Sequence, residues 1–340
     1  MSEFLKRNNI EFSLKRYGIE ALGAMALGLF ASLIIGLILN VIGEQLQINL
    51  LQQLGTRAIA MAGPAIGVAI AYGLKAPPLV LFASTITGMA GYELGGPAGC
   101  FAAAVIGAEF GKIVSGETRL DIIVTPVVTI MTGVTTGILI GPLVGGFMFW
   151  LGAVIMAITE IHPIPMGTLI AVIVGMTLTL PISSAALAIM LGLGGTAAGA
   201  ATVGCCCQMI GFAVSSYREN GLSGLLSQGL GTSMLQIPNI VKNPLIWIPP
   251  TLAGALLGPL ATTVFQMENI PTGAGMGTSG LVGQFGTIDA MGAGSEVLTR
   301  VALLHFILPA VITLLASEWM RHKGWIKPGD MSLRSGNHEK

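Results

Sequence analysis

The stretch PTGAGMGTSGLVGQFGTIDAMGAGS, residues 271–295, decides how the fold of this chain is interpreted. It holds eight glycines in 25 residues and a single acid, Asp289, with no Lys, Arg or Glu. It lies between two membrane-spanning segments, yet it is too polar and too glycine-rich for a lipid-facing helix. Non-helical backbone persists at membrane depth only where protein surrounds it or where it lines a watery cavity. We therefore expect a broken-helix or re-entrant element in a transport pathway.

The composition of the whole chain is that of an integral membrane protein. Of its 340 residues 53% are apolar and only 9% are charged, whereas about 25% of residues are charged in soluble proteins. The mean hydropathy is +0.81. We predict an all-α, polytopic membrane protein of about ten transmembrane helices, with broken or re-entrant segments.

Uncharged tracts between polar breaks indicate where the spans lie. Residues 19–42 predict an uncleaved first span, and the bases before it place the N-terminus in the cytoplasm. Residues 78–90 are short for a crossing and suit either a tilted segment or half of a broken helix. The 38 uncharged residues 122–159 predict two spans, with a turn at Gly141 and Pro142.

The chain divides into a cytoplasmic or interfacial segment at 1–18, a transmembrane domain at 19–320 and a cytoplasmic tail at 321–340. Two parts of the domain share an order of short sequence features: residues 76–99 parallel 180–199, and GILIGPLV at 137–144 parallels GALLGPLA at 254–261. We expect an internal repeat, about 57–144 and 167–261, because many transporters are built from such repeats and bind substrate where they meet.

Ionisable residues inside or beside spans are candidates for function, because burying a charge in a membrane is costly. Glu160 and His162 lie between uncharged tracts and are followed by Pro163 and Pro165, which interrupt regular helix. A carboxylate beside a neutral imidazole can both accept and donate hydrogen bonds to the hydroxyls of a sugar or polyol. The alternative is that both residues lie in a surface loop.

A second group of candidate solute-binding residues lies in the glycine-rich stretch. It consists of Thr278, Ser279, Gln284 and Asp289, and the alternative is a flexible aqueous loop. Gln236 and Asn239 border a further polar loop and are secondary candidates. His305, alone in the last span, is interpreted as a buried core histidine.

Two pairs of opposite charges have helical spacing. Glu109 and Lys112 are three residues apart, and Glu296 and Arg300 are four apart in the favourable order. We expect both pairs to be structural ion pairs.

Other classes of function lack their sequence signatures. The chain contains no P-loop, no HExxH and no GxSxG motif, and it lacks the basic patches with interleaved aromatics that bind nucleic acid. Cys100 and the run Cys205, Cys206 and Cys207 show no metal-ligand spacing and suit apolar packing. We expect no catalytic residues, no metal and no cofactor.

Residues 93–116 (ELGGPAGCFAAAVIGAEFGKIVSG) and 271–287 (PTGAGMGTSGLVGQFGT) carry a family resemblance. The chain resembles the membrane EIIC component of the bacterial sugar phosphotransferase system, in the compact subfamily that includes perfringolysin-regulator-type proteins, from roughly residue 15 to 325. AITEIHPIP at 157–165 is similar to the ITEP-type motif of glucose-superfamily EIIC proteins, whose glutamate contacts the sugar, which implies that role for Glu160. Ile161 and His162 stand before the proline here, and the role of His162 is inferred from its position.

The resemblance implies a permease that translocates a small hydroxylated solute, such as a sugar or polyol, in a bacterial cytoplasmic membrane. Separate EIIB and EIIA proteins would be its partners if transport is coupled to phosphotransfer, and the chain would at most be the membrane subunit of that system. A homodimer and cytoplasmic termini are expected. The alternatives are a membrane-embedded solute sensor, with residues 112–121 and the basic tail as its docking surface, and an ion-coupled secondary transporter.

Overall fold

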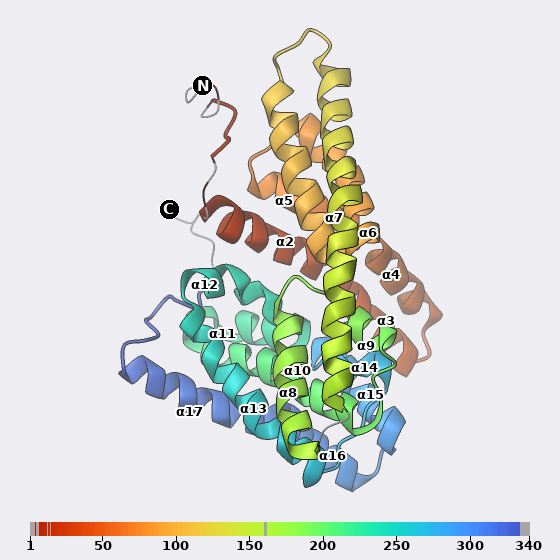
Figure 1. Ribbon diagram of the computed structural model, residues 1–340, viewed down its shortest axis with the longest axis vertical. Coiled ribbons are helices and arrows are strands. Elements are labelled where there is room, and N and C mark those ends of the chain that lie inside the picture. Colours follow the sequence, from red (N-terminus) through yellow and green to blue (C-terminus); the bar gives the residue numbers. More distant parts are fainter. Residues whose placement is uncertain (1–3, 5–6, 12, 14, 160–161, 334–340) are drawn as a thin grey trace. The chain divides into compact units, whose positions relative to one another are not determined.

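The computed structural model describes residues 4, 7–11, 13, 15–159 and 162–333 (Figure 1). This part of the chain is 82% helical and contains no strand, which confirms the all-α class. It forms two compact units, Met1–Phe149 and Trp150–Lys340. Among the described residues, six helices are long and apolar enough to cross a membrane, or seven if one bent pair is a further span. The predicted number of about ten is therefore not confirmed.

The first unit begins with the candidate span Arg16–Glu44, which confirms the span predicted at 19–42. The next two helices, α4 and α5, are bent by 51° from one another and together make the further candidate span. The elements of this unit before α7 are η1 (Arg16–Ala21), α2 (Leu22–Leu29), η2 (Phe30–Ile34), α3 (Ile35–Gln45), α4 (Asn49–Ala60), α5 (Ala62–Gly73) and α6 (Pro78–Val114), of which η1 and η2 are π-helical.

Helix α6 is interrupted a few residues after the short run at 78–90, as expected for half of a broken helix. Gly96 has φ 59° and ψ −153°, a backbone conformation that favours glycine, and Gly95 beside it is also non-helical. Upstream of the break, α6 packs closely on α5 because glycines face each other. A Cβ atom on Gly67 would lie 2.2 Å from the carbonyl oxygen of Ser84, and one on Gly88 would lie 2.4 Å from that of Gly63. Such small-residue contacts let membrane helices approach closely.

Helix α7 (Asp121–Thr159) corrects the prediction of two spans separated by a turn at Gly141 and Pro142. It runs as one helix of 39 residues with Pro126 and Pro142 inside it. At about 1.5 Å per residue it is roughly 58 Å long, well beyond the hydrocarbon thickness of about 30 Å. Proline is tolerated within membrane helices because nearby groups re-satisfy the freed backbone, so Gly-Pro alone is a weak turn signal there.

Charged side chains are buried together in the first unit. Lys112 Nζ lies 2.9 Å from Glu109 Oε2, which confirms the predicted ion pair, and Arg16 Nε lies 3.7 Å from Glu109 Oε1. Both cations also donate to the carbonyl oxygen of Leu74, at the C-terminus of α5, and Lys112 donates to that of Asn9. The helix terminus and these carbonyls compensate the second positive charge.

The second unit is built around α10, most of whose residues are buried. Helices α8, α13 and α17 pack against it. The elements of this unit are α8 (Pro163–Thr179), α9 (Ser184–Met190), α10 (Gly195–Ser215), α11 (Tyr217–Leu226), η3 (Ser227–Gly231), η4 (Ser233–Gln236), α12 (Ile237–Lys242), η5 (Pro244–Trp247), α13 (Ile248–Thr263), α14 (Pro271–Ala274), η6 (Ser279–Leu281), α15 (Val282–Met291), α16 (Ser295–Val301), η7 (Ala302–Ile307) and α17 (Leu308–His322).

Small residues in α10 let the neighbouring helices pack closely against it. A Cβ atom on Gly204 would lie 2.0 Å from the carbonyl oxygen of Ala171 in α8. The neighbouring Cys205, Cys206 and Cys207 are free thiols and fully buried. At the edge of the unit, Arg300 pairs with Glu296 at 2.5 Å, which confirms the second predicted ion pair.

We expect Gly204→Ala to destabilise the protein by about 1–3 kcal/mol, because the added methyl meets backbone, which cannot rotate away. Gly194→Ala is the matched control, since the nearest atom to a Cβ there is 3.8 Å away. Thermal unfolding in detergent measures both. Equal unfolding temperatures for the two variants would contradict the close approach of α8 and α10.

We expect Glu109→Gln to cost roughly 3–5 kcal/mol of unfolding free energy, because Arg16 and Lys112 would stay buried without a carboxylate. Glu117→Gln removes a carboxylate that pairs with Arg7 at the surface, and should cost under about 1 kcal/mol. Chemical unfolding of both variants in detergent gives the comparison. If Glu109→Gln lowered the unfolding free energy as little as Glu117→Gln does, the buried cluster would not be a source of stability.

Candidate functional site

The glycine-rich stretch is a broken helix, as its sequence predicts. Helix α14 ends after four residues, α15 begins at Val282, and the residues between them form turns and the short 3-10 segment η6. Gly277, Gly280 and Leu281 all have positive φ, of 54°, 53° and 62°. Residues 273–280 are buried without exception. Protein therefore surrounds the irregular backbone, which is the condition for keeping it at membrane depth.

Neighbouring elements hold this segment through its backbone carbonyls and through Thr278. Ser184 Oγ in α9 donates to the carbonyl oxygen of Gly275 at 2.7 Å. Thr278 Oγ1 donates to the carbonyl oxygen of Gly229 at 2.5 Å. The hydroxyl proton of Thr278 is thus already used within the protein, which makes Thr278 an anchor of the segment.

Asn269 fixes the start of the segment on α10 and α15. Its amide nitrogen donates to Thr202 Oγ1 in α10 at 2.7 Å, and to the carbonyl oxygen of Gly283 and Thr287 Oγ1 in α15. Its own oxygen accepts from the backbone N–H of Ile270. The sequence analysis did not single out this residue, although an asparagine between a span and a broken helix is a signal for such a bond.

Several buried polar atoms in this unit have no hydrogen-bond partner among the described residues, and Ser279 Oγ, Gln284 Oε1 and His305 Nε2 are three of them. Gln284 and His305 are in contact, with Gln284 Nε2 3.1 Å from His305 Nδ1. Gln284 Nε2 also lies 3.5 Å from Cys206 Sγ. Buried polar groups normally find partners, so a ligand or ordered water is expected to meet these atoms.

The structure does not bring Asp289 into this group. Gln284 is 6% exposed, whereas Asp289 is an exposed residue of the last turn of α15. Five residues of helix place the two side chains on different faces. His162 is also exposed, at the N-terminus of α8, and its side chain makes no capping hydrogen bond. Glu160 lies outside the described residues.

Gln236 and Asn239 lie in a buried chain of amides. Gln236 Nε2 donates to Gln228 Oε1 at 2.8 Å and to the carbonyl oxygen of Met331 at 3.0 Å. Asn239 Nδ2 donates to Gln236 Oε1 at 2.8 Å and to the carbonyl oxygen of Ser332 at 2.9 Å. Both residues therefore hold the segment 324–333, here called the C-terminal strap.

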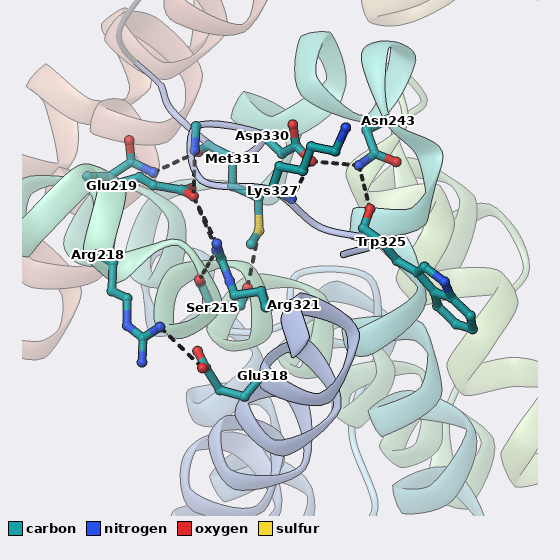
Figure 2. A network of polar contacts seen from close by, with 12 residues as sticks. Ser215, Arg218, Glu219, Asn243, Glu318, Arg321, Trp325, Lys327, Asp330 and Met331 are labelled. Atoms are coloured by element: carbon teal, nitrogen blue, oxygen red, sulfur yellow. Dashed lines mark hydrogen bonds and ion pairs between the residues drawn. The ribbon is translucent and has the colours of Figure 1, made fainter. Parts of the chain in front are cut away.

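The strap folds back from α17 across α11 and α12 (Figure 2). Arg321, where α17 ends, pairs with Glu219 at 3.2 Å, and Glu219 also accepts from the backbone N–H of Gly329. Asn220 donates to the carbonyl oxygen of Met331 and accepts from the N–H of Leu333, both at 2.8 Å. The side chain of Met331 is fully buried. The strap is thus an integral part of this unit.

His305 was interpreted as a core residue, and the structure buries it completely. A sequence signal does mark it. His305, Thr313 and Ser317, with Pro309 between them, recur at multiples of four residues, which puts three polar groups on one face of the last span. All four are buried, so this polar face is turned inward.

No cluster of three or more His, Cys, Asp or Glu side chains suited to a metal ion occurs in the described ranges. The groups brought together at Gln284 are an amide, an imidazole and a thiol. This set offers uncharged donors and acceptors, which suit a ligand that is rich in hydroxyl groups.

A comparison with family models matches residues 19–333 to the family described as Phosphotransferase system, EIIC. No curated protein and no solved structure matches the chain.

We expect Asn220→Ala to loosen the strap, because it removes one donor and one acceptor that hold residues 331–333. Trypsin should then cut faster after the exposed Lys323, at the start of the strap, which mass spectrometry measures over time. Asn49→Ala, on the exposed face of α4, is the control and should cut at the wild-type rate. Equal rates for both variants would mean that the strap is held by other contacts.

Proposed function

The chain belongs to the phosphotransferase-system EIIC family, and we propose that its broken segment, residues 271–295, holds the solute that it carries. Because it belongs to this family, the chain is a sugar-specific permease component and a multi-pass membrane protein. Phosphotransferase membrane components work on sugars, whose hydroxyls each donate and accept hydrogen bonds. The proposal concerns which residues meet those hydroxyls.

The observation that carries the proposal is the pair of partnerless buried atoms within the segment, Ser279 Oγ and Gln284 Oε1. An unmade hydrogen bond at a buried group costs about 1–3 kcal/mol, so a protein retains one where a ligand supplies the partner. Gln284 Oε1 would accept from one sugar hydroxyl. Ser279 Oγ would donate to or accept from another, and Thr278 would hold the backbone between the helices in place.

The other candidates have less support. Glu160 and His162 remain proposed sugar contacts on the resemblance to the ITEP-type motif alone. Asp289 would meet solute only if the site extended to the exposed end of α15, away from Gln284. Gln236 and Asn239 would join a site only if the strap moved away, because their amides bind the carbonyls of Met331 and Ser332.

The wider setting follows from the family. We propose separate cytoplasmic EIIB and EIIA proteins as partners, a homodimer, and a bacterial cytoplasmic membrane with both termini inside. Membership of the compact perfringolysin-regulator-type subfamily is part of this proposal. A sensor would use the same solute site without accumulating solute, so measured flux separates a sensor from a permease.

The test is binding of a panel of sugars and polyols to the purified protein, followed by uptake into proteoliposomes with a phosphorylated EIIB. We expect at least one sugar to raise the unfolding temperature and to be taken up. Gln284→Met keeps the length of the side chain but removes the amide with its donor and its acceptor, and should weaken binding about 10- to 100-fold.

Asp289→Asn is the comparison variant, since it lies on the same short helix but on another face. It should bind within about twofold of wild type. Loss of binding in Asp289→Asn with retention in Gln284→Met would move the site to the exposed end of α15 and contradict the proposal.

A further inference from the structure

The last candidate span carries an inward-facing row of polar atoms. His305 Nε2, Thr313 Oγ1 and Ser317 Oγ are each buried and without a hydrogen-bond partner in the part of the chain that the structure describes. Serine and threonine inside a helix usually bond to the carbonyl four residues earlier, and these two do not. The row faces α10, since a Cβ atom on Gly211 would lie 2.8 Å from Thr313 Oγ1.

His305 differs from the rest of the row because it reaches the broken segment. Gln284 Nε2 lies 3.1 Å from His305 Nδ1 and 3.5 Å from Cys206 Sγ, so in this orientation of the amide its N–H groups point to both. Nδ1 then accepts a hydrogen bond and carries no proton, so the ring is neutral with its proton on Nε2. The partnerless atom of His305 is therefore a donor, and that of Gln284 is an acceptor.

The backbone is irregular at the same point. His305 lies in the π-helical segment η7, and Pro309 begins the first turn of α17. Pro309 has no N–H and so cannot donate to the carbonyl oxygen of His305, four residues earlier. Short π-helical segments inside α-helices occur often at functional sites. Here the irregular turn is the one that contacts Gln284.

We infer that His305 is a sugar-binding residue, whose neutral imidazole donates from Nε2 to one sugar hydroxyl while Gln284 Oε1 accepts from another. This inference rests on the proposed function and extends its site from the broken segment to the last span. Together the two side chains offer one donor and one acceptor, the complement of a polyhydroxylated ligand. The solute thereby binds to two elements that are separate in the chain, α15 through Gln284 and η7 through His305.

The test compares His305→Gln, His305→Met and Thr313→Val with wild type. Glutamine can place an amide N–H near the position of Nε2, so His305→Gln should bind the sugar within about tenfold of wild type. His305→Met fills a similar volume without a donor and should bind about 10- to 100-fold more weakly. Thr313→Val removes another partnerless atom of the same row, two turns from His305, and should leave the affinity unchanged.

Monodeoxy analogues of the bound sugar separate recognition from a structural effect. If His305 donates to one hydroxyl, the analogue that lacks this hydroxyl should bind wild type and His305→Met equally, while the other analogues still favour wild type. A uniform loss across all analogues would mean that the methionine distorts the unit, and would overturn the inference. Unchanged affinity in His305→Met would overturn it as well.

The same measurements keep the two proposals apart. Wild type that binds sugars, with His305→Met indistinguishable from it, refutes the role of His305 and leaves the proposed permease site standing. Wild type that binds no sugar or polyol in the panel and takes none up refutes the proposed site, and the role of His305 falls with it.

Discussion

A membrane offers no water to an unpaired backbone group, and this constraint governs the second unit. The chain between Met267 and Gly283 leaves helix and turns repeatedly, so protein must supply every partner that lipid cannot. Ser184, Asn269 and Thr278 provide or place many of those partners. Their positions depend on α10, whose small residues let the other helices come close enough to enclose the irregular chain. The composition of α10, rich in Gly, Ala and Cys, is thus explained by what it encloses.

Charges in this protein fasten terminal segments to the bundle. In the first unit, Arg16 and Lys112 share Glu109 and the carbonyl oxygen of Leu74, which ties the start of the first span to α5 and α6. In the second unit, Glu219 binds Arg321 and the backbone of the strap. Glu109 is buried and Glu219 is partly buried, and each serves more than one donor. Neither tie belongs to the candidate sugar site, whose groups are uncharged.

Local spacing predicted what depends on neighbours in the chain. Helical pairs such as Glu296 and Arg300, the break at Gly95 and Gly96, and the broken glycine-rich stretch all follow from residues a few positions apart. The predicted turn at Gly141 and Pro142 was wrong. The sequence around a proline does not reveal whether nearby groups satisfy the carbonyl that the proline leaves unbonded. The internal repeat of residues 57–144 and 167–261 stays a prediction.

The candidate site was predicted only in part, since its geometry depends on contacts between distant segments. Ser279 and Gln284 were recognisable as polar residues in an unusual stretch, but their contact with the last span was not. The role of Gln236 as a holder of the strap requires Met331, 95 residues later. The polar residues at four-residue spacing in the last span include His305. This spacing indicates a site only once the structure shows that the polar face of the span is turned inward.

The strap also sets an order of assembly. Residues 324–333 leave the ribosome after every helix of their unit has been made, and only then are the carbonyls of Met331 and Ser332 present for Asn220, Gln236 and Asn239 to bind. Until synthesis passes Leu333, these amides lack their partners in the strap. The membrane-embedded core of the second unit therefore forms first, and its amide-bearing end closes only after that part of the chain has been translated. Premature termination before the strap would yield an inserted protein whose end is left open to water and to quality-control proteases.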